Sequence, residues 1–185
     1  LQVNGYGATR MGNRNRFCAP QGVYQCVGDD EWCAIAIDSD EQWQSLCHMI
    51  GQPDWATDPA YASHSARNKQ HDIIDAAITR WTQGLGKFDA MAELQAANIP
   101  AGAVQNSGDL AQDPQYKHRQ FHRFFDHPEM GNVPYSGHQY RISDYDNGPR
   151  GPAPCIGEHS FEVLSGIMGL TDEEIAAAYA SEAIA

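Results

Sequence analysis

The segment "GVYQCVGDDEWCAIAI" (residues 22–37) constrains the fold more than any other part of this sequence. Two stretches rich in β-forming residues flank the turn Gly28-Asp29-Asp30, which is the pattern of a hairpin. In the first stretch, Val23, Gln25 and Val27 alternate with Tyr24 and Cys26, whereas the second, from Trp32 to Ile37, is almost entirely apolar. An apolar strand is typical of the centre of a sheet. The segment therefore predicts an antiparallel hairpin whose second strand is central.

The remaining pattern mixes helices with short strands. Asp38-Ser39-Asp40 offers N-cap side chains for a helix, and Thr171-x-x-Glu174 forms a capping box. Helices are predicted at about 41–50, 62–83 and 87–97, with two more after residue 157, and further strands at about 102–105, around Phe124 and at 135–142. The predicted fold class is α/β of the α+β type: a small domain with an antiparallel sheet flanked by helices, plus a C-terminal helical segment.

The 185 residues suit one domain with extensions. We expect an N-terminal loop at 1–19, a small α/β domain at 20–143, and a loop rich in proline and glycine with C-terminal helices at 144–185. The sequence has no apolar run long enough for a membrane span and no signal peptide at its start. It also lacks an initiating Met, so a fragment or a trimmed product is expected.

Charge and cysteine content exclude several classes of site. A formal charge of -12 argues against nucleic-acid binding, which needs a basic face. The five cysteines include no C-x-x-C pair, so reduced thiols in a cytoplasmic protein are expected rather than a metal or redox site. His118 and His122 have helical ligand spacing, but their neighbours are basic and no third ligand is evident, so no metal site is predicted.

Two features stand out as candidate functional elements. The first 28 residues contain no Asp or Glu but do contain Arg10, Arg14 and Arg16, so the remaining 157 residues carry a charge of -15. Asp38 and Asp40 follow the apolar strand, where catalytic carboxylates often lie in α/β proteins, although N-capping of the next helix explains them as well.

Five segments, in their order, carry a family resemblance. They are "MGNRN…APQGVYQCVGDDEWCAIAI", "QWQSLCHMIGQPDWATDPAY", "ANIPAGAVQN", "DLAQDPQY" and "PAPCIGEHSFEVLSGIMGLTDEEI". Together they resemble the C-terminal part of family III CoA-transferases of the CaiB/BaiF type, which are related to formyl-CoA transferase and α-methylacyl-CoA racemase. The resemblance covers nearly the whole chain.

The resemblance implies a two-domain enzyme that forms interlocked dimers. An enzyme of this kind transfers CoA between acyl-CoA thioesters and carboxylic acids through a nucleophilic aspartate. That aspartate and most CoA contacts belong to the N-terminal part of the family sequence, so we expect no catalytic residue in this chain and no activity from it alone. The implied substrate is a coenzyme A thioester, with no permanently bound cofactor.

The same resemblance places an active-site loop at residues 13–18. Its members here are Asn13, Arg14, Asn15, Arg16, Phe17 and Cys18. Formyl-CoA transferases have glycines at the positions of Asn15 to Cys18, so a mobile glycine lid is in doubt. Arg14 or Arg16 could meet an acyl carboxylate or a CoA phosphate, or could lie against an acidic neighbour. In the racemase branch, Asp38 or Asp40 would lie near the substrate.

Two classes of function remain open. In the first, the chain is one part of a CoA-transferase, or of an acyl-CoA racemase, completed by a partner chain that carries the Rossmann-like half. In the second, it is a non-catalytic module for association or ligand binding. The two classes differ in whether this chain takes part in an enzyme. A homodimer with the C-terminal helices in its contact is preferred, and helices folded back onto the small domain are the alternative. The protein is expected to be cytoplasmic, with no nucleic-acid or membrane partner.

Overall fold

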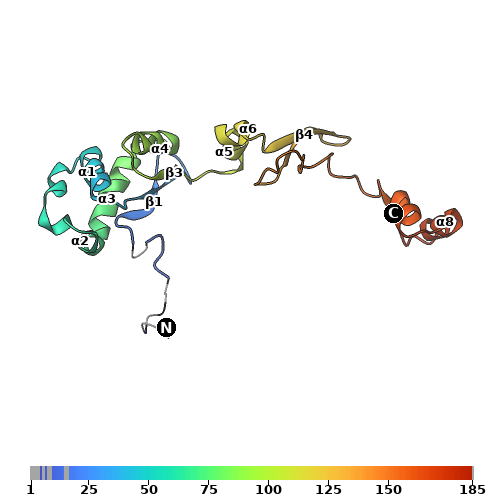
Figure 1. Ribbon diagram of the computed structural model, residues 1–185, viewed down its shortest axis with the longest axis horizontal. Helices are drawn as coiled ribbons and strands as arrows, with labels where there is room; N and C mark the ends of the chain where they lie inside the picture. The colour runs from blue at the N-terminus through green and yellow to red at the C-terminus, as the bar shows by residue number, and fades with distance from the viewer. Residues whose placement is uncertain (1–4, 6, 8–9, 15–16, 185) are drawn as a thin grey trace. The chain divides into compact units, whose positions relative to one another are not determined.

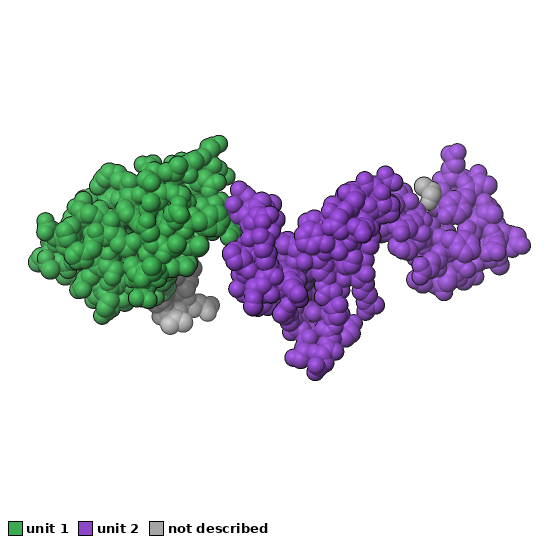
Figure 2. Space-filling model, turned by 90° about the horizontal axis from the view of Figure 1, so that it is seen from above, with its two compact units in different colours: residues 1–105 green, residues 106–185 purple. Residues whose placement is uncertain are grey.

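The computed structural model describes residues 5, 7, 10–14 and 17–184. Contacts along the chain group it into two units, residues 1–105 and 106–185 (Figure 2). The boundary between the units falls inside the domain expected at 20–143, whose limits stay a prediction. None of the described helices has the length and apolar character to cross a membrane.

Unit 1 is built on a three-stranded antiparallel sheet in the order β1-β2-β3. Its strands are β1 (Gln21–Gln25), β2 (Trp32–Ala36) and β3 (Ala101–Ala103). Residues 26–31 connect β1 to β2, and β2 is the central strand, so both predictions from the hairpin segment are confirmed. The sheets in both units are antiparallel, as the predicted fold class requires.

Helices of unit 1 pack against this sheet (Figure 1). The α-helices are α1 (Asp40–Met49), α2 (His64–Lys69), α3 (His71–Thr82) and α4 (Lys87–Ala96), and two short 3-10 helices are η1 (Pro53–Ala56) and η2 (Pro59–Tyr61). The predicted helix at 41–50 is confirmed: Ser39 caps it, and Trp43, Leu46 and Cys47 are buried. The core joins Ile35 and Ile37 of the β2 segment to apolar side chains of α1, α3 and α4.

The single helix predicted at 62–83 is wrong, because the chain turns at Gln70 and forms α2 and α3 instead. Ser63 caps α2 by accepting a hydrogen bond from the Ala66 amide. The turn lets two buried side chains reach the chain around the start of β1. Arg67 of α2 donates to the Ala19 carbonyl, and His71 of α3 accepts from the Gln21 amide.

Arg67 is a buried cation that joins several segments of unit 1. Its side chain is 5% exposed and donates to the carbonyls of Ala19 (2.9 Å) and Tyr61 (3.3 Å). Nη1 also lies 3.0 Å from a carboxylate oxygen of Asp40, which is 70% exposed. The guanidinium lies over the Trp43 ring, 5.5 Å from its centroid. Because Asp40 is in solvent, the carbonyl contacts carry most of the stabilisation.

Unit 2 contains short helices, a hairpin and the C-terminal helices. Its elements are α5 (Ser107–Gln112), α6 (Pro114–His118), β4 (His122–His127), β5 (Gly131–Ser136), α7 (Ser160–Glu162), a π-helical turn (Val163–Ile167) and α8 (Asp172–Ala180). The predicted capping box of α8 is confirmed, since Thr171 and Glu174 each accept from the other's amide. Ile175 of α8 is buried, whereas Ile167 and Met168 are exposed.

The strand predicted at 135–142 is wrong in its bounds. The strand β5 pairs with β4 from Gly131 to Ser136, and the chain then leaves the ladder. The turn between the two strands sets this register. His127 at the end of β4 accepts hydrogen bonds from the amides of Glu129 and Met130, so the turn is short and β5 begins at Gly131. Gly137 closes the pairing by donating to the Phe121 carbonyl at 2.7 Å.

The Arg67 contacts give a testable stability difference. Arg67→Ala should lower the free energy of unfolding by about 2–4 kcal/mol, since two buried carbonyls lose their donor and a packed side chain is lost. Asp40→Asn, which removes only the exposed partner, should cost less than about 1 kcal/mol. Urea denaturation followed by tryptophan fluorescence measures both. Equal losses for the two variants would show that the ion pair, and not the buried hydrogen bonds, holds this region.

Candidate functional site

One face of the unit 1 sheet carries small side chains and is not part of the core. Tyr24, Cys33 and Ile35 are buried on the core face. Because successive side chains of a strand point to opposite faces, Val23 and Ala34 belong to the other face. Val23, Ala34 and Gly102 lie in register across β1, β2 and β3. This row forms a shallow floor on which a ligand could approach the backbone closely.

A groove of about 750 Å³ lies over the Val23 and Ala34 part of this floor. The residues that line it come from three places: the loop Gly12–Arg14, the paired strands β1 and β2, and Pro100 with Ala101 at the start of β3. Its volume falls in the range of small-molecule sites. The groove is therefore a candidate binding site built from segments that are distant in sequence.

The loop at 12–14 is fixed to the sheet by local hydrogen bonds. Gly12 has φ +65°, a left-handed conformation that favours glycine. The Arg14 amide donates to the Met11 carbonyl at 3.3 Å, which closes a turn. The Gln21 side chain donates from Nε2 to the Asn13 carbonyl at 3.2 Å. The loop thereby stands beside the first residue of β1, where it lines the groove.

Arg14 anchors the loop to α3. Its Nη2 donates to Asp72 at 2.7 Å and to Asp75 at 2.5 Å. These hydrogen bonds raise the pKa of Arg14, so the guanidinium stays charged. One arginine with two carboxylates leaves a net charge of -1. The structure thus places Arg14 against acidic neighbours, one of the two arrangements considered for this loop from the sequence.

Asp75 extends the anchor into the core of unit 1. Its Oδ1 accepts a hydrogen bond from the Tyr24 hydroxyl at 2.8 Å and lies 3.5 Å from Nε2 of His71. The same Nε2 accepts from the Gln21 amide at 3.2 Å. His71 is 2% exposed, and its Nδ1 has no hydrogen-bond partner among the described residues. A single aspartate therefore connects the loop, β1 and α3.

The protonation states in this network suit positioning rather than proton transfer. Burial lowers the pKa of His71, and the carboxylate of Asp75 opposes this only in part. Burial also raises the pKa of Tyr24, with Asp75 adding to the effect, so the phenol keeps its proton. A buried neutral imidazole and a protonated phenol provide no activated nucleophile. The described residues also contain no cluster of three or more His, Cys, Asp or Glu able to hold a metal.

Only some residues of the predicted active-site loop line the groove. Asn13 and Arg14 line the groove. Phe17 is 87% exposed and Cys18 is half-buried, and neither lines it. Asn15 and Arg16 lie outside the described residues.

The candidates Asp38 and Asp40 do not line the groove. Both are exposed, and the N-cap of α1 is the residue between them: Ser39 accepts from the Gln42 amide at 3.3 Å. The Asp38 amide donates to the side chain of Gln42 at 3.0 Å, and Asp40 contacts Arg67. Both residues therefore contribute to the start of α1.

The anchoring residues His71, Asp72 and Asp75 were not predicted from the sequence. A signal was present, since residues three and four apart on a helix share a face. That spacing brings His71 next to Asp75, and Asp72 next to Asp75. What the spacing does not give is the partner, because Arg14 is 58 residues away from Asp72 in sequence.

Comparison with known proteins now identifies the family. Residues 2–160 match the model of CoA-transferase family III. This chain belongs to CoA-transferase family III. A probable CoA-transferase of Mycobacterium tuberculosis is 33% identical over 82% of this chain. A formyl-CoA:oxalate CoA-transferase of Bradyrhizobium diazoefficiens is 30% identical over 98% of it.

The crystal structure of a CaiB/BaiF family protein from Brucella suis has the same fold. It covers 90% of this chain with a TM-score of 0.76 and 27% identity, while this chain covers 42% of that protein. The chain spans 19% of the mycobacterial relative and 43% of the Bradyrhizobium relative. The family resemblance seen in the sequence is therefore confirmed, and it concerns less than half of these relatives.

The buried neutral His71 predicts a pH dependence of stability. In the unfolded chain, histidine has a pKa of about 6.5. Above that pH, His71 is neutral in both the folded and the unfolded protein. Below it, the unfolded chain binds a proton at His71, whereas burial lowers the pKa of His71 in the folded protein and so opposes protonation there. Stability should therefore fall as the pH drops from about 7 to 5, with a slope of at most about 1.4 kcal/mol per pH unit for this one proton.

His71→Gln keeps a hydrogen-bond acceptor for the Gln21 amide but cannot titrate. It should flatten this part of the curve, whereas His48→Gln, at an exposed position of α1, should not. Urea denaturation across the pH range gives the slopes. A wild-type slope that His71→Gln leaves unchanged would contradict the neutral buried state.

Proposed function

We propose that this chain forms one side of the acyl-CoA site of a family III CoA-transferase, which moves CoA from an acyl thioester to a carboxylic acid. The observation that carries the proposal is the groove over Val23 and Ala34, walled by the loop that holds Arg14. That loop is the one the family resemblance assigns to the active site. The CoA-transferase names of the relatives support the same reaction class.

In this proposal the chain's own residues bind the acyl thioester and shield it from water, and none of them acts as the nucleophile. The small side chains of the floor admit an extended thioester arm close to β2. The loop excludes water from the thioester while it is held in place by Arg14, Asp72 and Asp75. The nucleophilic carboxylate belongs to a segment outside these 185 residues. Its oxygen attacks the thioester carbonyl, the C–S bond breaks, and the CoA thiolate leaves.

The charge of the anchor suits this role. Arg14 is neutralised by two aspartates, so among the described residues that line the groove there is no spare cation to bind an acceptor carboxylate. In this proposal, the residues that select the carboxylic acid acceptor belong to the segment that carries the nucleophile. The apolar floor selects for the acyl thioester arm and against a charged group.

The test is complementation in two pieces. The chain alone should show no exchange of CoA between a thioester and a free carboxylic acid. Mixed with the part of the Bradyrhizobium formyl-CoA:oxalate CoA-transferase that it does not match, it should restore exchange of formyl-CoA with oxalate, on the order of 10²-fold above either piece.

The positive control joins the two corresponding pieces of the Bradyrhizobium enzyme itself. If those pieces recover exchange and this chain does not, the proposal fails and a non-catalytic module is favoured. Exchange by this chain alone would show that the nucleophile has been assigned to the wrong segment. Loss of the α-proton of an acyl-CoA to solvent, without CoA exchange, would point to a racemase instead.

A further inference from the structure

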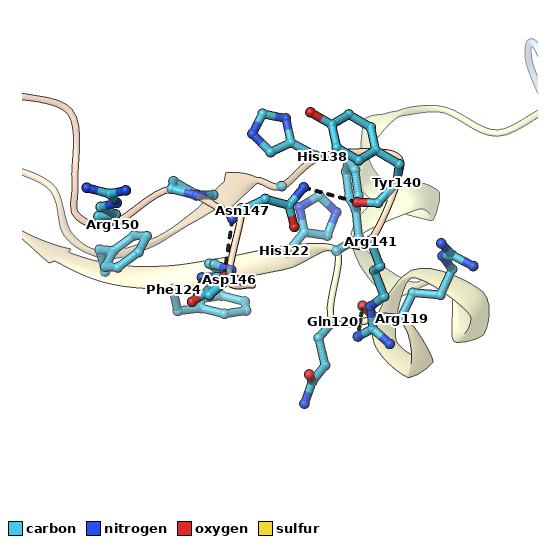
Figure 3. Close-up of a pocket in the computed structure, with 16 residues that line it drawn as sticks. Arg119, Gln120, His122, Phe124, His138, Tyr140, Arg141, Asp146, Asn147 and Arg150 are labelled. Carbon is cyan, nitrogen blue, oxygen red and sulfur yellow. Dashed lines mark hydrogen bonds and ion pairs between the residues drawn. The ribbon is translucent and has the colours of Figure 1, made fainter. Parts of the chain in front are cut away.

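A positively charged cavity lies in unit 2 of this otherwise acidic protein. It has a volume of about 710 Å³ and is formed by the end of α6, strand β4 and the segment 137–150 that follows β5. Four arginines contribute to its lining: Arg119, Arg123, Arg141 and Arg150. Figure 3 shows Arg119 and Arg141 together at the α6 end, with Arg150 toward the other end of the view.

Only one of these arginines is neutralised. Asp146 is the one carboxylate among the lining residues, and it makes a two-pronged ion pair with Arg123. This pairing, with a further hydrogen bond from the Gly148 amide, lowers the pKa of Asp146 to about 2. The pair is therefore fixed and neutral above about pH 4. It builds the wall, and Arg150 acts on the Asp146 carboxylate only through its charge.

The other three arginines contact neutral groups or none. Arg141 donates to the Arg119 carbonyl at 2.7 Å, and Arg150 donates to the Tyr145 hydroxyl at 3.2 Å. The Arg119 guanidinium has no hydrogen-bond or ion-pair partner among the described residues. The cavity thus carries a net charge of +3 from these arginines, in a chain whose formal charge is -12. A concave site focuses such a field on a bound anion.

The segment that closes the cavity is held in a defined conformation. Asn147 donates to the Tyr140 carbonyl at 3.3 Å (Figure 3). A Cβ added to Gly148 would lie 2.3 Å from the guanidinium carbon of Arg123, so a larger residue there would force the Arg123 side chain to shift. The arginines are therefore mounted on a wall that is already formed.

Aromatic rings accompany the charges. Phe124 is 62% exposed and Tyr140 is 57% exposed, although both line the cavity. His138 stacks on Tyr140 with ring centroids 5.4 Å apart and planes 15° apart. Exposed ring faces beside guanidinium groups suit a planar ligand group that stacks while its anionic groups are bound.

We propose that this cavity binds a small-molecule oxyanion with two or more negative charges, phosphate or carboxylate, joined to a planar group. Phosphate and carboxylate share the geometry that guanidinium recognises, so the experiment separates them. A long polyanion such as nucleic acid is disfavoured by the charge of the whole chain. The site needs no catalysis, and its test is independent of the proposed function.

The experiment titrates the full chain with three probes: inorganic pyrophosphate, citrate and 3′,5′-adenosine diphosphate. Binding is followed by calorimetry, and amide chemical shifts locate it. We expect shifts within residues 119–150, and the tightest binding for the probe that combines phosphates with a planar base. Arg119→Gln and Arg150→Gln should each weaken that binding about tenfold. Added salt should weaken it as well.

Arg80→Gln is the matched control, because Arg80 is an exposed arginine of α3 in unit 1 and its loss makes the same change in charge. It should leave the affinity unchanged. Tighter binding of citrate or pyrophosphate than of 3′,5′-adenosine diphosphate would overturn the planar group in the proposal, since neither probe carries a ring that can stack. The proposal is overturned if none of the probes binds at millimolar concentration. It is also overturned if Arg80→Gln weakens binding as much as the cavity variants do, since the attraction would then be unspecific.

Discussion

The carboxylate of Asp75 is the contact on which the candidate site depends. One oxygen accepts from Arg14 of the loop, and the other accepts from the buried hydroxyl of Tyr24 in β1. His71, one turn before Asp75 on α3, accepts from the first amide of β1. Without this carboxylate, a buried phenol would lack its acceptor and the loop would lose one of its two anchors. The position of the groove wall thus follows from the packing of α3 on β1.

Local patterns in the sequence predict the parts of the fold that depend on neighbouring residues. The hairpin at 22–37, the cap of α1 by Ser39 and the capping box of α8 each involve residues within a few positions of one another. The almost entirely apolar stretch from Trp32 to Ile37 also identifies β2 as the central strand of the sheet.

What the sequence does not predict is set by distant partners. The break between α2 and α3 reflects the contacts of Arg67 and His71 with the chain near β1. The true start of β5 reflects the hydrogen bonds that His127, the last residue of β4, accepts from the following turn. In the site, the loop position followed from family resemblance. The aspartates that hold Arg14 are visible only once α3 is folded against the sheet.

In the proposed function, the described residues of this chain supply the floor and wall of the groove, and the reactive carboxylate comes from a segment outside these 185 residues. The two charged regions of the protein differ in whether their arginines are neutralised by carboxylates. Arg14 is neutralised for a structural role, whereas the unit 2 cavity keeps three arginines without a carboxylate.

The most direct measurement uses a substitution whose side chain fills the groove. In the complemented enzyme, Ala34→Phe places a ring on the groove floor, whereas Ala76→Phe places the same ring on an exposed position of α3. If the groove holds the thioester arm, Ala34→Phe lowers kcat/KM by on the order of 10² while Ala76→Phe has little effect. The free energy of unfolding should stay within about 1 kcal/mol for both variants. An unchanged kcat/KM for Ala34→Phe would contradict the assignment of the acyl-CoA site to this groove.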